Sequence, residues 1–392
     1  MAERPRVALD IETSLVYGRR ILDGISHYLR ASRPWSIYLE QHELSTDLPG
    51  FLRRWNGDGI ITRQATADSV RLLRRKRLTA IDLGDLKPHL GILRIGSAHT
   101  AIGRMAAEHL LERGFENFAC CGFLGEHWSE RRRDGFIAEI GHHRFQSSVY
   151  ESPRAGLQVW RRDQTRMLEW IKSLRQPVGV FATNDLRGQH VLDACGQLDL
   201  AVPEQVAVIG CDNDEVVCNL CNPPLSSVIP HPERIGYEAA QWLDRMMKGD
   251  HPAVLDVEIP PQGIAVRQSS DVFAVSDAVV ASALRFIRER ACEGATVQDL
   301  VDHLSVSRSW LERNFRKLLN RSPQAEIRAV QVKRCKELLR STTLSLEKIA
   351  RLAGFEHPEY MSVVFKRETG ITPGQYRTRN GAALSGAAAQ IK

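Results

Sequence analysis

The chain has 392 residues, of which 43% are hydrophobic and 26% carry charged side chains, so it is long enough for two or three domains with separate cores. This composition is that of a soluble globular protein and excludes a membrane-embedded one. The charge is uneven: from residue 276 onward 20 Lys and Arg residues stand against 12 Asp and Glu, a net charge of +8, whereas the residues before it carry 33 against 35, a net charge of −2.

The first part of the chain alternates between short apolar strands and amphipathic helices. A strand is expected at residues 6–11, and the helix after it has Ile21, Leu22, Ile25 and Leu29 on one face. Further strands are expected at residues 59–61, 80–83, 118–121, 178–181 and 206–209. This alternation predicts α/β structure with parallel sheets, in which ligands bind beyond the carboxyl ends of the strands.

Polar side chains and one tryptophan lie where these strands end. They include Glu12, Trp128, Asn184, Asp185 and Asp212. Such a set suits a polyhydroxylated ligand, because each sugar hydroxyl needs a donor or acceptor and the apolar face of the sugar stacks on an aromatic ring. Helix N-caps and turns favour the same residue types, so this alternative stays open for each single residue.

A short polar segment at residues 269–276 separates the predicted effector domain, residues 5–268, from a second domain at residues 277–379. Residues 380–392 are expected to be disordered. The second domain opens with a helix that has Val279, Val280, Leu284 and Ile287 on one side.

Residues 296–379 contain two copies of a helix-turn-helix pattern. In the first copy the helices are joined at Ser305, and the second helix buries Leu311, Phe315 and Leu318. In the second copy the turn lies at Gly354, and a connecting helix that opens at Pro323 joins the two copies. Because an α-helix fits the major groove, the outward side chains of the second helix in each copy are predicted to contact DNA. With the nearby Arg321, they are Arg308, Ser309, Glu312, Arg313, Arg316, His357, Glu359, Ser362 and Lys366.

Two sequence blocks of this domain, residues 307–317 and 365–377, resemble the signature blocks of AraC-type transcriptional regulators. The phrase F-K-R-E-T-G-I-T-P is the more specific of them. The resemblance implies an all-α DNA-binding domain with two helix-turn-helix motifs. The basic charge of this part of the chain agrees with phosphate binding.

The preceding 260 residues resemble the effector domain of lactose-repressor (LacI/GalR) type regulators. The resemblance is carried by residues 103–114, 132–136, 181–185, 202–212 and 223–228. It implies a two-lobed α/β periplasmic-binding-protein-like fold that dimerises and binds a sugar between its lobes. By position in these blocks it also implies that Arg132, Asn184 and Asp212 contact the sugar, and Arg19 completes the predicted ligand-binding set.

An effector domain of this type followed by an AraC-type pair resembles the xylose operon regulators of bacteria. It implies a homodimeric transcriptional regulator, an activator, that binds operator DNA and RNA polymerase and responds to xylose. Another sugar as effector stays open, and so does repression in place of activation. A sugar-acting enzyme fused to a DNA-binding domain is the distant alternative, but no nucleophile motif or phosphate loop supports it.

The eight cysteines lack the regular pairing of a disulfide framework, and no signal peptide is present, so we expect a cytoplasmic, nucleoid-associated protein. A transport receptor is excluded on the same ground. Cys218 and Cys221 have the spacing of half a zinc site, but a second pair at ligand spacing is missing. We therefore expect neither a metal nor a cofactor.

Overall fold

The structure is a computed structural model that describes residues 4–32, 34–39, 48–84, 90–153, 157–271 and 277–380. The chain divides into two compact units at residue 274, and each unit is described by itself. No helix in the described ranges is long and apolar enough to cross a membrane.

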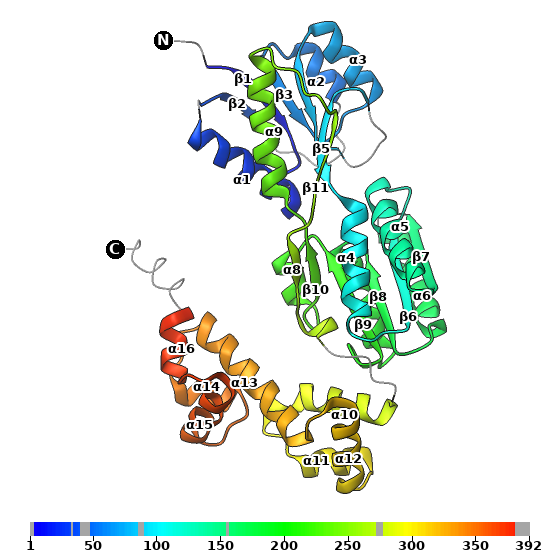
Figure 1. Cartoon of the computed structure of the whole chain (residues 1–392), viewed down its shortest axis with the longest axis vertical. Coiled ribbons are helices and arrows are strands. Elements are labelled where there is room, and N and C mark those ends of the chain that lie inside the picture. The colour runs from blue at the N-terminus through cyan, green and yellow to red at the C-terminus, as the bar shows by residue number, and fades with distance from the viewer. Residues whose placement is uncertain are drawn as a thin grey trace. The chain divides into compact units, whose positions relative to one another are not determined.

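The first unit consists of two α/β lobes, each built on a six-stranded sheet (Figure 1). The sheet of the first lobe has the order β11-β5-β4-β3-β1-β2, and all its strands are parallel. Its strands are β1 (Arg6–Asp10), β2 (Ser36–Leu39), β3 (Gly59–Thr62), β4 (Thr79–Asp82), β5 (Leu93–Ser97) and β11 (Asp256–Ile259).

Helices cover both faces of this sheet. Alternate residues of β1 explain why: Val7 and Leu9 join a core with α1 and α9, whereas Ala8 joins a core on the opposite face with α2 and α3. The helices are α1 (Val16–Ala31), α2 (Leu48–Arg54), α3 (Ala67–Lys76) and α9 (Pro232–Met247).

The sheet of the second lobe has the order β12-β10-β9-β8-β6-β7 and is parallel except for β12, which pairs antiparallel with β10. Its strands are β6 (Asn117–Leu124), β7 (Ser147–Pro153), β8 (Val178–Ala182), β9 (Val206–Cys211), β10 (Ser226–Ile229) and β12 (Gly263–Ala265). The helices are α4 (His99–Leu111) and α5 (His127–His142) on one face, and α6 (Leu157–Ser173), α7 (Asp185–Gln197) and α8 (Glu215–Leu220) on the other.

The chain passes between the lobes three times, after β5, after β10 and after β11. The two-lobed α/β class expected from the sequence is confirmed, and all six predicted strands are present. The remaining strands escaped prediction because they are short, lie at sheet edges, or carry polar residues, as β5 does at Arg94.

The first unit continues beyond the predicted boundary at residue 268. Ser269 and Ser270 form a 3₁₀ turn with Gln268 and are fully buried against the second lobe. The Ser269 hydroxyl donates to the Val208 carbonyl at 2.6 Å, and His109 contacts the Ser270 hydroxyl at 2.8 Å. Residues 269–270 of the predicted linker are thus part of the effector unit, whereas residues 272–276 lie outside the described residues.

The second unit is helical. Its elements are α10 (Ala278–Arg290), the 3₁₀ turn η2 (Ala291–Glu293), α11 (Val297–Leu304), α12 (Arg308–Leu319), α13 (Pro323–Ser341), α14 (Leu346–Leu352), α15 (Pro358–Thr369) and α16 (Pro373–Asn380). Asn380, which the sequence placed in a disordered tail, closes α16, and residues 381–392 of that predicted tail lie outside the described residues.

Each helix-turn-helix has local signals that fix its ends. Thr296 and Asp299 form a capping box at the start of α11, and Ser305 ends that helix in the left-handed region with φ of 52°. The Ser307 hydroxyl then caps α12. The second copy uses Ser345 as the cap of α14 and Gly354 in its turn.

Candidate functional site

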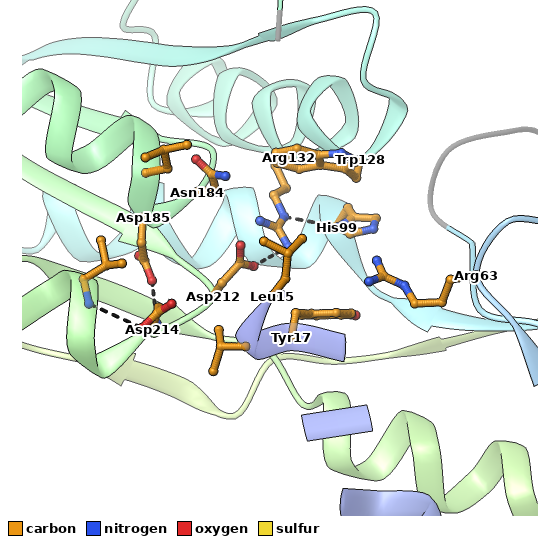
Figure 2. A pocket seen from close by; sticks show the side chains of 13 residues that line it. Leu15, Tyr17, Arg63, His99, Trp128, Arg132, Asn184, Asp185, Asp212 and Asp214 are labelled. Atoms are coloured by element: carbon orange, nitrogen blue, oxygen red, sulfur yellow. Dashed lines mark hydrogen bonds and ion pairs between the residues drawn. The ribbon is translucent and has the colours of Figure 1, made fainter. Parts of the chain in front are cut away.

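A cavity of about 250 Å³ lies between the lobes of the first unit (Figure 2). From the first lobe it is lined by Leu15, the first turn of α1 and the residue after β3, and from the second lobe by residues near the N-terminal ends of α4, α5, α7 and α8 and by the loop after β9. The lining residues are Leu15, Val16, Tyr17, Arg63, His99, Trp128, Arg132, Asn184, Asp185, Leu186, Asp212, Asp214 and Val217.

Arg132 is the central cation of this cavity. Its side chain is 3% exposed, and its guanidinium donates to the Thr183 carbonyl at 2.7 Å, to Asp212 Oδ1 at 2.9 Å and to His99 Nδ1 at 3.2 Å. Burial lowers the pKa of Arg132, but the charge of Asp212, the hydrogen bond to Asp212 and weaker contributions from neighbouring groups together raise it by more, so its pKa lies above the ordinary value. The guanidinium is therefore a permanently charged donor in a fixed orientation.

Asp212 follows β9 and has a backbone φ of 105°, a region that residues with a Cβ rarely adopt. The contacts around it hold this conformation: its amide donates to the Val228 carbonyl at 3.2 Å, and Arg267 donates to the next side chain, Asn213, at 2.8 Å. One oxygen of Asp212 accepts from Arg132, and the carboxylate retains capacity to accept from a ligand.

Asn184 and Asp185 begin α7. The Asn184 side-chain oxygen accepts from the Arg187 amide at 2.9 Å and caps the helix, which leaves the side-chain NH₂ group as a donor. Asp185 is 3% exposed and accepts from the Ser227 hydroxyl at 2.6 Å and from the Asp214 amide at 2.7 Å. Burial, and then the charge of Asp212, raises the pKa of Asp185 to about 7.

Aromatic rings form the walls of the cavity. The Arg132 guanidinium lies 5.1 Å from the centre of the Trp128 ring, and the Trp128 indole N–H donates to Glu126 at 3.0 Å. On the first lobe, Arg63 lies 4.8 Å from the centre of the Tyr17 ring. Paired donors and acceptors beside aromatic faces can bind the hydroxyl groups and the apolar face of a sugar. The volume is below the roughly 300–1,000 Å³ of pockets for drug-sized ligands, which favours a single sugar ring.

In the second unit, α12 presents the side chains predicted to face DNA. Leu311 and Phe315 are buried, whereas Arg308, Arg313 and Arg316 are exposed. Arg308 pairs with Glu312 one turn later at 3.3 Å. Because Leu311 and Phe315 enter the core, the opposite face of α12 points outward, as predicted.

The second candidate reader, α15, buries Met361, Val364 and Phe365 and exposes the predicted His357, Glu359 and Lys366. Ser362 is half-buried, and its hydroxyl donates to the Pro358 carbonyl at 2.9 Å. Arg321 lies between α12 and α13. Its side chain is exposed and forms an ion pair with Glu326 at 2.5 Å.

Three family models match separate parts of the chain. A XylR N-terminal domain matches residues 6–87, a periplasmic binding protein-like domain matches residues 107–270, and a helix-turn-helix domain matches residues 300–379. The xylose operon regulatory protein of Haemophilus influenzae is 33% identical over 95% of this chain and 98% of its own length. The chain belongs to the family of the xylose operon regulatory proteins.

Two further similarities cover the whole chain. The xylose operon regulatory protein of Escherichia coli K12 is 29% identical over 97% of this chain and 99% of its own length. A solved structure of the xylose-binding transcription activator XylR superposes with a TM-score of 0.83 at 29% identity, over 97% of this chain and 99% of that one. As a member of this family the chain is a sugar-sensing transcription regulator with an AraC-type DNA-binding domain.

Five of the seven predicted ligand-binding residues line the cavity: Trp128, Arg132, Asn184, Asp185 and Asp212. The lining does not include Glu12 or Arg19. Glu12 is fully buried and forms an ion pair with Arg63, so Arg63 rather than Glu12 reaches the cavity. Arg19 is exposed, and its guanidinium donates to the carbonyls of Thr13 and Ser14.

The sequence analysis did not predict that Tyr17, Arg63 and His99 line the cavity. Arg63 directly follows β3, so the end of a predicted strand was an available signal. His99 follows β5, a strand that was not predicted, and Tyr17 lies in the first turn of α1. The isolated Cys218 and Cys221 are both buried free thiols, and the described residues contain no cluster that would hold a metal ion.

Proposed function

We propose that this protein binds xylose in the cavity between its lobes and, in response, activates transcription of a xylose utilisation operon. The observation that carries the proposal is the Arg132–Asp212 pair, which lies at 2.9 Å in a cavity of single-sugar size. Similarity to xylose operon regulatory proteins over nearly the whole chain supports the choice of sugar.

The contacts of the sugar follow from the chemistry of the lining. Arg132 and Asn184 donate to hydroxyl oxygens, Asp212 accepts from hydroxyl groups, and Trp128 covers the apolar face of the ring. Arg63 adds a donor from the first lobe, held in place by its ion pair with Glu12. Contacts from both lobes let the sugar stabilise one arrangement of the lobes over another.

On the DNA side, α12 and α15 each enter a major groove of the operator, and the exposed cations near them contact phosphates. Each protomer of a homodimer brings one such pair, and the complex recruits RNA polymerase. The protein acts in the cytoplasm on the nucleoid, and its role is regulatory rather than catalytic.

Thermal unfolding with a panel of pentoses and hexoses tests the effector. A ligand that binds only the folded state at 100 times its Kd adds about 2.7 kcal/mol to the free energy of unfolding, so xylose should raise the Tm of the effector unit clearly above the other sugars. The Asp212→Ala variant serves as control and should lose the shift. A larger shift with another sugar than with xylose would overturn the choice of xylose.

A further inference from the structure

The two helix-turn-helix motifs have separate hydrophobic cores that share one helix, α13. Its residues Ile327 and Val330 pack with α10, α11 and α12, whereas Val332 and Cys335 pack with α14 and α15. Gln331 lies at the boundary between the two cores and is 1% exposed. A polar side chain in this buried place must have its hydrogen bonds satisfied by its neighbours.

Gln331 bonds to both motifs at once. Its side-chain NH₂ group donates at 2.9 Å to the carbonyl of Ala291, just before the first motif, and at 2.9 Å to the carbonyl of Gly354, in the turn of the second. Its oxygen accepts from Arg328 at 2.6 Å. Carbonyls only accept and a guanidinium only donates, so these partners fix the orientation of the amide.

The backbone contact at the same place is close. Gly354 has φ of 76°, and a Cβ added to it would lie 2.3 Å from the Ala291 carbonyl oxygen. Arg328 covers this junction: its guanidinium lies 5.4 Å from the centre of the Phe355 ring and 4.9 Å from that of Tyr360, at the start of α15. The first motif, α13 and the turn of the second motif thus meet around one amide.

We propose that Gln331 is a positioning residue that sets the orientation of α12 relative to α15 and thereby the spacing of the two DNA segments that the protein accepts. The inference rests on the proposed function, in which both helices read DNA. Helix α13 contributes to the cores of both motifs, and the Gln331 amide bonds to the backbones of Ala291 and Gly354 across their junction. Two rigidly linked readers gain affinity only on DNA whose segments match their geometry.

The test uses the full-length protein with xylose and a duplex selected from random DNA by the wild type. Derivatives of this duplex carry one or two inserted base pairs between the two segments, or a scrambled second segment. Gln331→Glu keeps the length but loses the donors, and Gln331→Met removes all hydrogen bonds. Gln324→Met, at an exposed glutamine of the same helix, is the matched control.

Wild type and Gln324→Met should bind the selected duplex best and discriminate against the insertions. Both Gln331 variants should bind the scrambled duplex as wild type does, bind the selected duplex about tenfold more weakly, and discriminate little among the insertions. Unchanged discrimination, or equal loss of binding to every duplex, would overturn the role of Gln331. If the wild type selects no DNA with two segments, the proposed function itself fails.

Discussion

At the residue scale, the cavity is organised around one buried cation whose donors have fixed partners. Arg132 is held by the Thr183 carbonyl, by His99 and by Asp212, so its orientation does not depend on a ligand. Such preorganisation lowers the entropy cost of binding, because fewer side chains must become ordered when the ligand enters. A sugar that adds hydrogen bonds to this set gains specificity, because an analogue without the matching hydroxyl leaves buried polar groups unpaired.

We predict that Asp212→Ala weakens xylose binding by about 1–3 kcal/mol, because the variant loses an acceptor and leaves Arg132 with an unpaired charge in the cavity. Isothermal titration calorimetry measures the change. Asp193→Ala, at an exposed aspartate of α7 outside the cavity lining, is the control and should bind as wild type does. Equal affinities for the two variants would remove Asp212 from the binding set.

Asp185 should make stability depend on pH. Its pKa is raised to about 7 by burial and by the charge of Asp212, whereas an aspartate in the unfolded chain has a pKa of about 3.9. Between these values the folded state binds more protons than the unfolded state, so this carboxyl lowers the free energy of unfolding as the pH rises from 4 to 7.

Asp185→Asn mimics the protonated form and should remove this contribution. The Tm of the variant minus that of wild type should therefore grow from pH 4 to pH 7 and stay constant above, as measured by thermal unfolding in a pH series. Burial lowers the pKa of His109 to about 3, which opposes folding as the pH falls below 6.5, but this effect is common to both proteins and cancels. A difference that does not change with pH would contradict the raised pKa.

At the element scale, the two candidate reading helices begin differently. Ser307 caps α12 with its hydroxyl, whereas α15 starts with Pro358 at its first position and its N-cap residue, His357, makes no side-chain capping bond. The imidazole of His357 therefore makes no capping hydrogen bond to the backbone of α15. The start of α15 at Pro358 keeps the predicted register, in which Glu359 and Lys366 are exposed.

We predict different effects for two arginines near α12. If Arg313 pairs with a base edge, Arg313→Ala should cost about 1–3 kcal/mol on the operator and relax the preference at one position. Arg321→Ala should weaken binding to all sequences and lower the salt slope by about one unit. The Arg321 side chain stays exposed in its ion pair with Glu326, whose own side chain is mostly buried, so a phosphate can reach Arg321 and replace this partner.

Titrations of operator and random DNA at several salt concentrations distinguish the two roles. Equal weakening of operator and random DNA by Arg313→Ala would make Arg313 a phosphate contact and would require a different orientation of α12 in the groove.

At the scale of the whole molecule, the chain separates its charges between its two units. The net charge of +8 lies in the residues from 276 onward, where the candidate readers are, and the effector part is close to neutral. The two sheets of the effector unit are joined by three crossings of the chain, and each lobe has hydrophobic cores of its own.

We predict that the protein is a homodimer through its effector unit. Sedimentation equilibrium should give twice the chain mass of 44.1 kDa, with and without xylose. A fragment of residues 1–271 should sediment as a dimer, and one of residues 277–392 as a monomer. A monomer of the full chain under all conditions, operator DNA included, would refute the prediction.

The sequence by itself determined the class of both units and the duplicated reader, because these depend on local periodicity. Leu311 and Phe315 repeat at the helical period and so orient α12 before any contact is known. The predicted strands also follow from a local sequence pattern, since each is a short apolar run and amphipathic helices separate most of them.

Only the tertiary structure decided which polar residues share the cavity. Tyr17, Arg63 and His99 are far apart in sequence from Arg132 and Asp212, and they meet because parallel strands of two sheets end on facing sides of one cleft. Glu12 lies at the predicted strand end yet is buried beneath Arg63, a distinction that side-chain packing makes and sequence spacing does not. Gln331 likewise has no signal of its own, since its two carbonyl partners are separated from it by 40 and 23 residues.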